Sequence, residues 1–316
     1  RQIIISPGID IFNCKLYKFL KLNKKKIYTD LDVFFTFFKN KCITITGTNG
    51  KSTTAKILYE VLKDQKKDVR LIGNIGNPPL NEKRISKNTI FVIEASSYQL
   101  DYSQLFSSKY SIILNIKPDH LERHKTLQNY VDAKFKLLDS QSKSCLAFVK
   151  SNDALISRKL KTKKFNCKIV KVNTKKNYND FLEIKNKYFL TESNIENLSF
   201  IIELAKKLKL KNYLLQKTIK NFKGLKYRQQ IIIQKKYLTI INDSKSTSFS
   251  SSVGMLKKKD SNILWLLGGI YKKGDKLELK KKDLSNVTAF IYGENKNLFI
   301  KPVSYTHLRA HETLVH

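Results

Sequence analysis

Short, nearly continuous apolar runs recur along this chain and are separated by longer segments of mixed polarity. The runs cover residues 42–46, 69–73, 89–94, 111–116, 145–149 and 263–269. Apolar runs of about four to eight residues are typical of strands that are buried on both faces. The segments between them, such as 52–65 and 129–140, place apolar residues at helical spacing. Strands alternating with helices predict an α/β fold in which helices cover a parallel sheet.

The pattern changes near Gly224. Two amphipathic helical segments, at 194–209 and 212–222, end there. A pair of strand-like segments, at 229–234 and 237–242, follows and opens a second α/β pattern. We therefore predict a domain boundary close to this glycine.

A chain of 316 residues is longer than one that usually folds around a single hydrophobic core, so two or three domains are expected. We predict a central domain at 30–224, preceded by a short region at 1–29 and followed by a smaller domain at 225–303. Residues 304–316 lack lysine but hold three of the chain's five histidines, His307, His311 and His316. This break in composition predicts a foreign tail. A metal site built from these histidines is the alternative, although no carboxylate-rich segment accompanies them.

The formal net charge of +35 raises the question of a nucleic-acid partner, because clustered Lys and Arg release counterions from phosphates. The lysine runs, at 24–26, 257–259 and 280–282, lie far apart in sequence. Asn and Ile are also abundant, which suggests an AT-rich genome. We expect no nucleic-acid partner, although the excess charge attracts anionic nucleotides in general.

Composition also indicates a cytoplasmic location. No stretch of about 18 residues is continuously apolar, and the first residues lack the basic and then apolar pattern of an export signal. The four cysteines are scattered without a CxxC pair, as suits buried thiols in a reducing compartment. We expect no membrane segment. Residue 1 is not Met, so we also expect the native N-terminus to precede it.

A glycine-rich loop, GTNGKST at 47–53, joins the predicted strand 42–46 to a helical segment. Backbone N–H groups of such a loop, together with the helix N-terminus, can surround phosphate oxygens. Lys51 would contact the β- and γ-phosphates, and the Ser52 hydroxyl would ligate Mg²⁺. A full P-loop pattern has glycine where this chain has Ile45, so a glycine turn with an incidental lysine is the alternative. The predicted ATP-binding residues here are Gly47, Thr48, Asn49, Gly50, Lys51, Ser52 and Thr53.

Polar side chains follow two further predicted strands. Glu94 ends the run 89–94, and Asp119 with His120 follows the run 111–116. Ligand sites of parallel α/β proteins lie at the carboxyl ends of the strands, and a carboxylate there suits Mg²⁺. His120 is able to ligate a second cation. Each residue alone could equally cap a helix or a turn, but together beside a phosphate loop they predict a metal–nucleotide site.

The motifs occur in a fixed order: GTNGKST, GNIGNPPL, EASSYQL, LNIKPDHLERH, YVDAKFKLL, NIEN, NDSKST and LGGIYKKGD. With them the chain resembles the Mur ligase family of peptidoglycan synthesis, from Ser6 to about Gly293. SPGI, GNIG and SSYQL favour the branch that adds D-glutamate to UDP-N-acetylmuramoyl-L-alanine. Another Mur or folylpolyglutamate-type ligase is one alternative, and a basic, nucleotide-dependent nucleic-acid-binding protein is the other.

The resemblance implies a three-domain, ATP-dependent ligase that acts through an acyl phosphate with two Mg²⁺ ions. It implies a central P-loop-type ATPase domain and a Rossmann-like C-terminal domain. Residues 1–29 would be the remnant of the N-terminal UDP-binding domain, and 225–303 would be a truncated C-terminal domain. We expect a monomer.

The resemblance also assigns roles to residues that would bind the UDP-linked substrate and the metal ions. Ser6, Gly8, Asn74 and His120 would contact that substrate. Glu94 and Ser52 would hold one Mg²⁺. Lys134 matches a lysine that the family carbamylates, which would bind the second Mg²⁺ beside His120. Lys136 on the same predicted helix is an alternative for this role.

The remaining roles implied by the resemblance concern ATP and D-glutamate. Asn197 would meet adenine, although Ser193 replaces the histidine usual in that motif. Arg228 and Asp243 would contact ATP phosphates and ribose. Lys245 and Thr247 would face the reaction centre, followed by Ser248 where the family usually has Asn. Lys272 would pair with D-glutamate, with Lys273 as the alternative. The predicted catalytic residues are Lys51, His120, Lys134 and Lys245.

Overall fold

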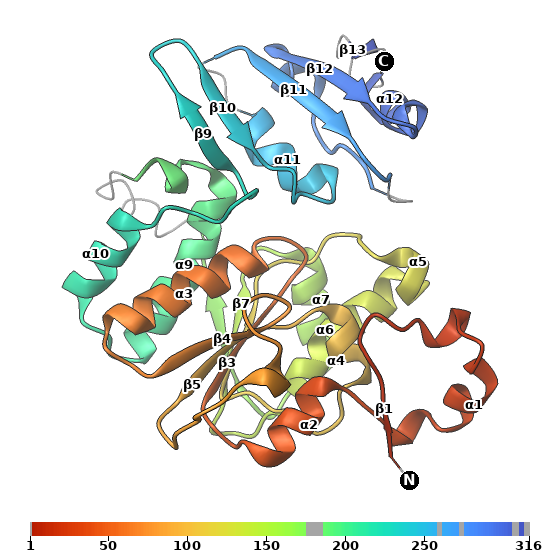
Figure 1. Cartoon of the computed structure of the whole chain (residues 1–316), viewed down its shortest axis with the longest axis vertical. Coiled ribbons are helices and arrows are strands. Elements are labelled where there is room, and N and C mark those ends of the chain that lie inside the picture. The colour runs from red at the N-terminus through yellow and green to blue at the C-terminus, as the bar shows by residue number, and fades with distance from the viewer. Residues whose placement is uncertain (1, 175–185, 258–260, 272–274, 305–309, 313–316) are drawn as a thin grey trace. The chain divides into compact units, whose positions relative to one another are not determined.

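The computed structural model describes residues 2–174, 186–257, 261–271, 275–304 and 310–312. Contacts within the chain divide it into two units (Figure 1). The first comprises residues 1–116 and 123–225, and the second comprises residues 117–122 and 226–316. The division at Leu225 lies one residue from the end of the predicted central domain. The short region 1–29 belongs to the first unit and does not form a unit of its own.

A six-stranded parallel sheet forms the centre of the first unit. Its strands, in spatial order, are β4 (Val69–Gly73), β5 (Ile90–Glu94), β3 (Cys42–Thr46), β6 (Tyr110–Ile113), β7 (Leu146–Lys150) and β8 (Lys168–Val172). Each neighbouring pair is parallel. The first five apolar runs therefore form strands as predicted, and the α/β fold class is confirmed. Strand β8 was not predicted, because the lysines of its KIVKV sequence interrupt the apolar pattern.

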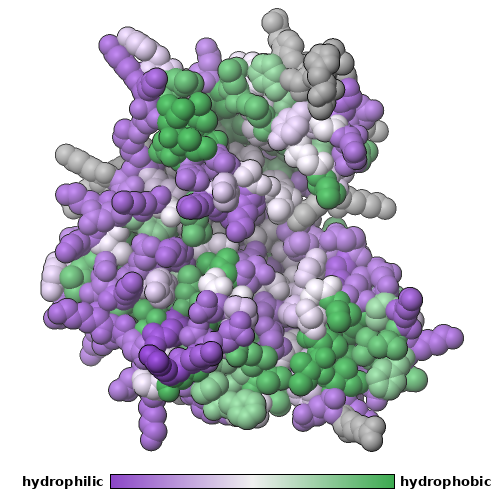
Figure 2. All heavy atoms as spheres, viewed as in Figure 1, coloured by the Kyte–Doolittle hydropathy of each residue, from purple (hydrophilic) through white to green (hydrophobic). Residues whose placement is uncertain are grey.

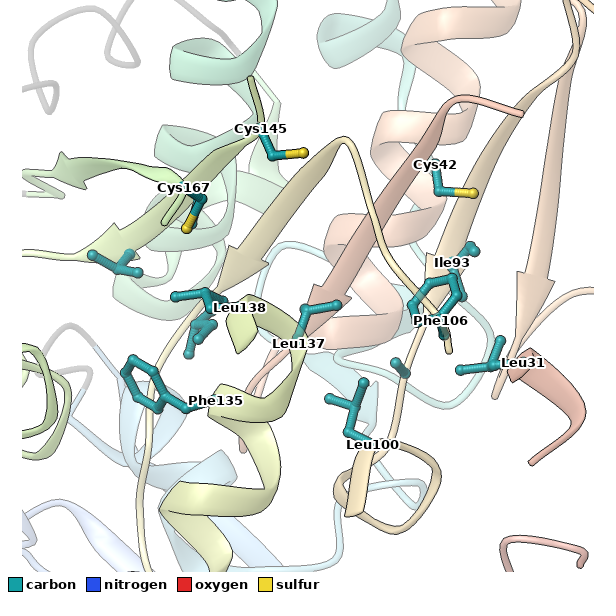
Figure 3. Close-up of a cluster of buried hydrophobic side chains, with 14 of the residues drawn as sticks. Leu31, Cys42, Ile93, Leu100, Phe106, Phe135, Leu137, Leu138, Cys145 and Cys167 are labelled. Atoms are coloured by element: carbon teal, nitrogen blue, oxygen red, sulfur yellow. The ribbon is translucent and has the colours of Figure 1, made fainter. Parts of the chain in front are cut away.

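Helices pack on both faces of this sheet, because the side chains of a strand alternate between faces. One face packs against α3 (Lys51–Asp64) and α9 (Glu192–Lys207), with α10 (Asn212–Asn221) packed on those two helices. The other face packs against α2 (Asp30–Phe37), α4 (Ser97–Tyr102), α6 (Leu127–Asp139) and α7 (Ala154–Thr162). Figure 3 shows this second cluster, to which α6 contributes Leu137, α4 contributes Leu100 and β3 contributes Cys42.

The N-terminal segment forms a small core of its own against α4. Strand β1 (Ile3–Ile4) pairs in parallel with β2 (Ile27–Tyr28). Between them lie η1 (Ile11–Asn13), α1 (Tyr17–Leu22) and η2 (Lys24–Lys26). The buried side chains are Ile5, Ile11, Leu20, Ile27 and Tyr102. The outer side of the segment exposes apolar residues such as Phe19 and Leu22, and apolar side chains gather over this region in Figure 2.

Short elements complete the first unit. They are η3 (Pro79–Asn81), α5 (Leu121–His124), which begins in the 117–122 segment, and η4 (Lys187–Leu190).

The second unit contains an antiparallel hairpin and a small parallel sheet. The hairpin is β9 (Gln230–Gln234) with β10 (Thr239–Asn242). The sheet has the order β11 (Ile263–Gly268), β12 (Val287–Tyr292) and β13 (Ala310–Glu312). Helices α11 (Phe249–Leu256) and α12 (Lys296–Ser304) contribute Phe249, Leu256 and Phe299 to its core, and η5 (Lys281–Asp283) precedes β12.

The predicted foreign tail overlaps this sheet, since residues 310–312 pair in parallel with β12. His307 and His316 of the alternative metal site lie outside the described residues. The origin of the tail stays a prediction. Among the helices that the structure describes, none has the length and apolar character needed to cross a lipid bilayer.

Candidate functional site

The loop between β3 and α3 requires glycine at both ends. Gly47 has φ +151°, and a Cβ there would lie 3.0 Å from the Cβ of Leu114. Gly50 has φ +85°, and a Cβ there would lie 2.1 Å from the Asn197 Oδ1 atom. The positive φ strains any residue with a side chain at either position, and a Cβ at Gly50 would also displace the Asn197 side chain. The predicted strand, glycine loop and helix are therefore present in that order, and Asn197 of α9 lies against the loop.

Lys51 is the first residue of α3 and folds back over this loop. Its Nζ donates to the carbonyl oxygens of Gly47 at 3.0 Å and of Thr48 at 2.7 Å. The next two residues, Ser52 and Thr53, are buried, and the Thr53 hydroxyl lies 3.4 Å from the Tyr188 hydroxyl. The first turn of α3 thus places an ammonium group and two hydroxyl groups at the loop.

Lys134 reaches the same loop from α6. It is 1% exposed, and its Nζ donates to the Gly47 carbonyl oxygen at 2.8 Å. The Nζ also lies 4.4 Å from the centroid of the Tyr130 ring, whose hydroxyl is 3.0 Å from the Thr48 hydroxyl. Lys136, the sequence alternative, instead contacts the Asp101 carboxylate at 3.2 Å. Of these two lysines, Lys134 is the one that contacts the phosphate loop.

Glu94 and Asn74 lie together at the carboxyl end of β5. The Asn74 side chain donates from Nδ2 to Glu94 Oε1 at 2.8 Å, and its backbone N–H donates to the Glu94 carbonyl oxygen at 2.9 Å. Glu94 is 1% exposed, and its Oε2 atom has no hydrogen-bond partner within the described part of the chain. A buried carboxylate oxygen without a donor is costly unless a cation is nearby. This geometry is suited to a metal ion.

Ser6 and Gly8 lie in the turn that follows β1. The Ile9 backbone N–H donates to the Ser6 carbonyl oxygen at 3.0 Å and closes the turn. The side of Gly8 where a Cβ would stand is open, with the Ser6 hydroxyl 4.0 Å away. The turn is mostly exposed and accessible to a ligand.

His120 adopts φ +55°, which is uncommon for a residue with a side chain. Its backbone N–H donates to Asp119 Oδ1 at 3.0 Å. Its ring nitrogens lie 3.4 Å from an Asp119 oxygen and 3.5 Å from a Glu122 oxygen. His120 belongs to the segment 117–122, which groups with the second unit. Its predicted place beside Glu94 and Lys134 stays a prediction.

The second unit contains two of the residues expected to contact ATP, Arg228 and Asp243. Asp243 accepts from the Gln229 backbone N–H at 3.0 Å and from the Ser246 hydroxyl at 2.7 Å. Burial raises the pKa of Asp243, and these hydrogen bonds and the charge of Arg228 act in the opposite direction. The Lys245 backbone N–H donates to the Tyr227 carbonyl at 3.1 Å.

Of the other residues predicted in this unit, the structure describes Thr247 but not Lys272. Thr247 lies between β10 and α11, directly before Ser248, which is the residue preceding that helix. Lys272 and Lys273 lie outside the described residues, so the choice between them stays open.

Sequence reasoning missed a polar network that holds the phosphate loop. Asn115 accepts from the Asn49 backbone N–H at 2.9 Å through Oδ1, and its Nδ2 donates to the Asn49 carbonyl at 3.2 Å. The same Nδ2 donates to Glu196 Oε1 at 3.2 Å, and Glu196 forms an ion pair with Lys150. Asn115 stands in the LNIKPDH motif two residues after the end of β6, which was the available signal. Its partners are distant in sequence and could not be identified from it.

No three His, Cys, Asp or Glu residues gather as a possible metal site in the described portions of the chain. Mg²⁺ commonly takes one or two carboxylates and completes its shell with phosphate oxygens and water.

Comparison with known proteins identifies relatives of this chain. A family model described as the Mur ligase middle domain matches residues 45–216, which is more than half of the chain. UDP-N-acetylmuramoylalanine–D-glutamate ligase of Rickettsia felis is 33% identical over 95% of this chain and 70% of that enzyme. The ligase of the same name from Francisella tularensis subsp. novicida is 33% identical over 93% of this chain and 70% of the enzyme.

Solved structures share the fold. MurF from Acinetobacter baumannii has a TM-score of 0.63 with 16% identity, over 90% of this chain and 74% of that one. MurF ligase from Thermotoga maritima, in complex with ADP, has a TM-score of 0.60 with 12% identity, over 99% of this chain and 85% of that one. These identities show the fold alone. The family model and the coverage of the two sequence relatives together establish that this chain belongs to the Mur ligase family.

Proposed function

We propose that this chain is an ATP-dependent amide ligase that joins D-glutamate to UDP-N-acetylmuramoyl-L-alanine in peptidoglycan synthesis. The observation that carries the proposal is the convergence of two lysines on the phosphate loop. Lys51 from α3 and Lys134 from α6 both donate to the Gly47 carbonyl. The relatives from R. felis and F. tularensis bear this activity in their names, and their identity to this chain supports the same substrates.

The reaction must first convert a carboxylate, which is a poor electrophile at neutral pH, into a reactive acyl group. A carboxylate oxygen of the UDP-linked alanine attacks the γ-phosphorus of ATP, and the bond to the bridging oxygen breaks as ADP leaves. The D-glutamate amine then attacks the acyl phosphate, loses a proton, and expels inorganic phosphate to leave an amide. Lys51 at the loop reduces the repulsion between the two anions that must meet.

The residues at the end of β5 fit a Mg²⁺ ion, because Glu94 Oε2 is a buried carboxylate oxygen without a donor among the residues described. Glu94 and Ser52 would hold one ion, and His120 with carbamylated Lys134 would hold the second. When bound, the ions supply positive charge against the phosphates. The carbamate forms when the neutral Lys134 amine adds to CO₂ and loses a proton, which replaces a cation with an anion.

Other residues bind and orient the substrates in this proposal. Ser6, Gly8, Asn74 and His120 contact the UDP-linked substrate. Asn197 contacts adenine, and Arg228 and Asp243 contact phosphates and ribose. Lys245, Thr247 and Lys272 act near the reacting groups and D-glutamate. We expect a cytoplasmic monomer.

The test is phosphate release from ATP by the full-length gene product. Release should require both UDP-N-acetylmuramoyl-L-alanine and D-glutamate. Replacing D-glutamate with L-lysine, meso-diaminopimelate or L-alanine should reduce turnover to background. Equal turnover with one of these amino acids would assign the chain to another ligase of the same fold. A salt-steep affinity for polynucleotide without amino-acid-dependent turnover would instead favour the nucleic-acid alternative.

A further inference from the structure

Arg123 of α5 has a nearly enclosed side chain that the proposed reaction does not use. It is 9% exposed. An isolated buried guanidinium is costly, so its charge must be compensated by the groups around it. Those groups indicate what the residue does.

One side of the guanidinium faces the turn that carries Ser6 and Gly8. Its Nη1 donates to the Gly8 carbonyl at 3.4 Å, and its Nη2 donates to the Pro7 carbonyl at 3.3 Å and to the Ile9 carbonyl. Its Nε lies 3.8 Å from Asp10 Oδ1. Three consecutive carbonyl oxygens and the next carboxylate therefore converge on one cation.

Aromatic rings from α4 contact the guanidinium as well. The Arg123 Cζ atom lies 4.7 Å from the centroid of the Tyr98 ring and 5.6 Å from that of Tyr102. Tyr98 belongs to the SSYQL segment, and Tyr102 belongs to the small core of the N-terminal segment. A planar guanidinium suits such contacts because its flat face can stack on aromatic rings while the N–H groups at its edge donate hydrogen bonds.

This arrangement orients the backbone of the turn. In a trans peptide unit the C=O and N–H bonds point in opposite directions. The structure contains no cis peptide among the residues described. Because the carbonyls of Pro7, Gly8 and Ile9 point to Arg123, the N–H groups of the same peptide units point away from it. One of them, the Ile9 N–H, closes the turn on the Ser6 carbonyl oxygen at 3.0 Å. The other two belong to Gly8 and Asp10, and backbone N–H groups gathered in a turn favour an anion such as a diphosphate.

We propose that Arg123 is a positioning residue that holds the turn 6–10 in the conformation that binds the UDP-linked substrate. The inference rests on the proposed function, which supplies that substrate. Arg123 contacts backbone carbonyls and not the reacting atoms. Its loss should therefore weaken binding of one substrate and leave the chemical step nearly unchanged.

The test compares Arg123→Ala and Arg123→Lys with Arg158→Ala, which removes an exposed arginine of α7. Initial rates of phosphate release by the full-length gene product are measured while each substrate is varied. Arg123→Ala should raise the KM for the UDP-linked substrate about tenfold or more, as expected when several charged hydrogen bonds are lost. The KM values for ATP and D-glutamate, and kcat, should change by less than about twofold. The KM of Arg123→Lys for the UDP-linked substrate should lie between that of the wild type and that of Arg123→Ala. Arg158→Ala should have the kinetic constants of the wild type.

Added guanidinium chloride at millimolar concentration should lower the raised KM of Arg123→Ala, because the ion can enter the vacated space between the tyrosines and the carbonyls. Sodium chloride at the same concentration should not. An unchanged KM for the UDP-linked substrate, or an equal loss in all kinetic constants without rescue, would overturn the proposal. If Arg123→Ala does not fold by circular dichroism, the same comparison is made with Arg123→Lys and Asp10→Asn, and a KM for the UDP-linked substrate that is unchanged in both overturns it.

Titration calorimetry with UDP-N-acetylmuramoyl-L-alanine separates this inference from the proposed function. Wild-type binding that weakens in Arg123→Ala supports the positioning role even if D-glutamate is not the second substrate. Equal binding by both proteins overturns the positioning role alone. Absence of wild-type binding overturns both.

Discussion

Two lysines on one helix have different environments at the scale of single residues. Lys134 is buried and donates to the phosphate loop, whereas Lys136 is about one-third exposed and pairs with Asp101. A step of two residues turns a side chain by about 200° on a helix with roughly 3.6 residues per turn. The chemical role proposed for Lys134 therefore has a control two residues away.

We expect Lys134→Ala to be nearly inactive in ordinary buffer and to regain part of its activity when acetate is added. The vacated space beside Gly47 would admit a short carboxylic acid, which replaces the anionic end of the carbamate. The loss should be on the order of the 10²–10³-fold cost of one transition-state contact. The measurement is phosphate release across a titration of acetate.

Lys136→Ala should keep activity close to that of the wild type, because an exposed ion pair contributes about 0–1 kcal/mol to stability. Wild-type activity in Lys134→Ala, or an inactive Lys136→Ala that acetate restores, would show that the carbamate is placed on the wrong lysine.

The start of α2 shows how one side chain connects elements of the first unit. Asp32 is fully buried and accepts from the Thr29 backbone N–H at 3.0 Å, as part of the capping box of this helix. Its other oxygen accepts from the backbone N–H groups of Leu105 at 2.7 Å and Phe106 at 2.9 Å, and from the Ser103 hydroxyl at 2.7 Å. The helix is thereby tied to the connection between α4 and β6.

We expect Asp32→Ala to lower the free energy of unfolding of the first unit by roughly 3–5 kcal/mol, because several buried donors would lose their acceptor. Asp32→Asn should cost less, since one oxygen acceptor is retained. The measurement is urea unfolding followed by far-ultraviolet circular dichroism, since the single tryptophan, Trp265, reports on the second unit.

A suitable control for this series is Asp139→Ala, which removes a partly exposed ion pair with Lys163 from the same unit. Its cost should stay below about 1 kcal/mol. If Asp32→Ala is no more destabilising than this control, the capping role assigned to Asp32 is wrong.

Charge is the dominant property at the scale of the whole molecule. The chain carries 61 Lys and Arg against 26 Asp and Glu, which leaves a net charge of +35. Hydrophilic side chains cover much of the face shown in Figure 2. Self-repulsion of a large net charge destabilises compact states and is screened by salt.

We expect the unfolding temperature to rise between about 0.02 M and about 0.2 M NaCl, over which the Debye length falls from roughly 20 Å to about 7 Å. Each 1 kcal/mol of repulsion that salt removes should raise the unfolding temperature of the first unit by about 2–4 °C. The measurement is thermal unfolding at matched pH in the absence of nucleotide. KCl should give the same shift as NaCl if screening is the cause. A constant or falling unfolding temperature would contradict this account.

Local pattern was sufficient to predict the elements around the phosphate loop. The apolar runs and the glycine loop identify β3, the turn and α3. A strand buried on both faces requires continuous apolar residues, and a backbone with positive φ favours glycine. Glu94 was predicted at a strand end for the same reason. Strand β8 was missed because lysines interrupt its apolar run.

The sequence by itself determined the fold class, five of the six strands of the parallel sheet and the residue types at their carboxyl ends. Only the tertiary structure decided which side chains meet: Lys134 instead of Lys136 at Gly47, Asn115 on Asn49, and Arg123 on the 6–10 turn. Arg123 and Gly8 are separated by 115 positions along the chain. Residue type and local spacing describe neighbours along the chain, whereas these contacts depend on parallel strands that bring distant segments to one edge of a sheet.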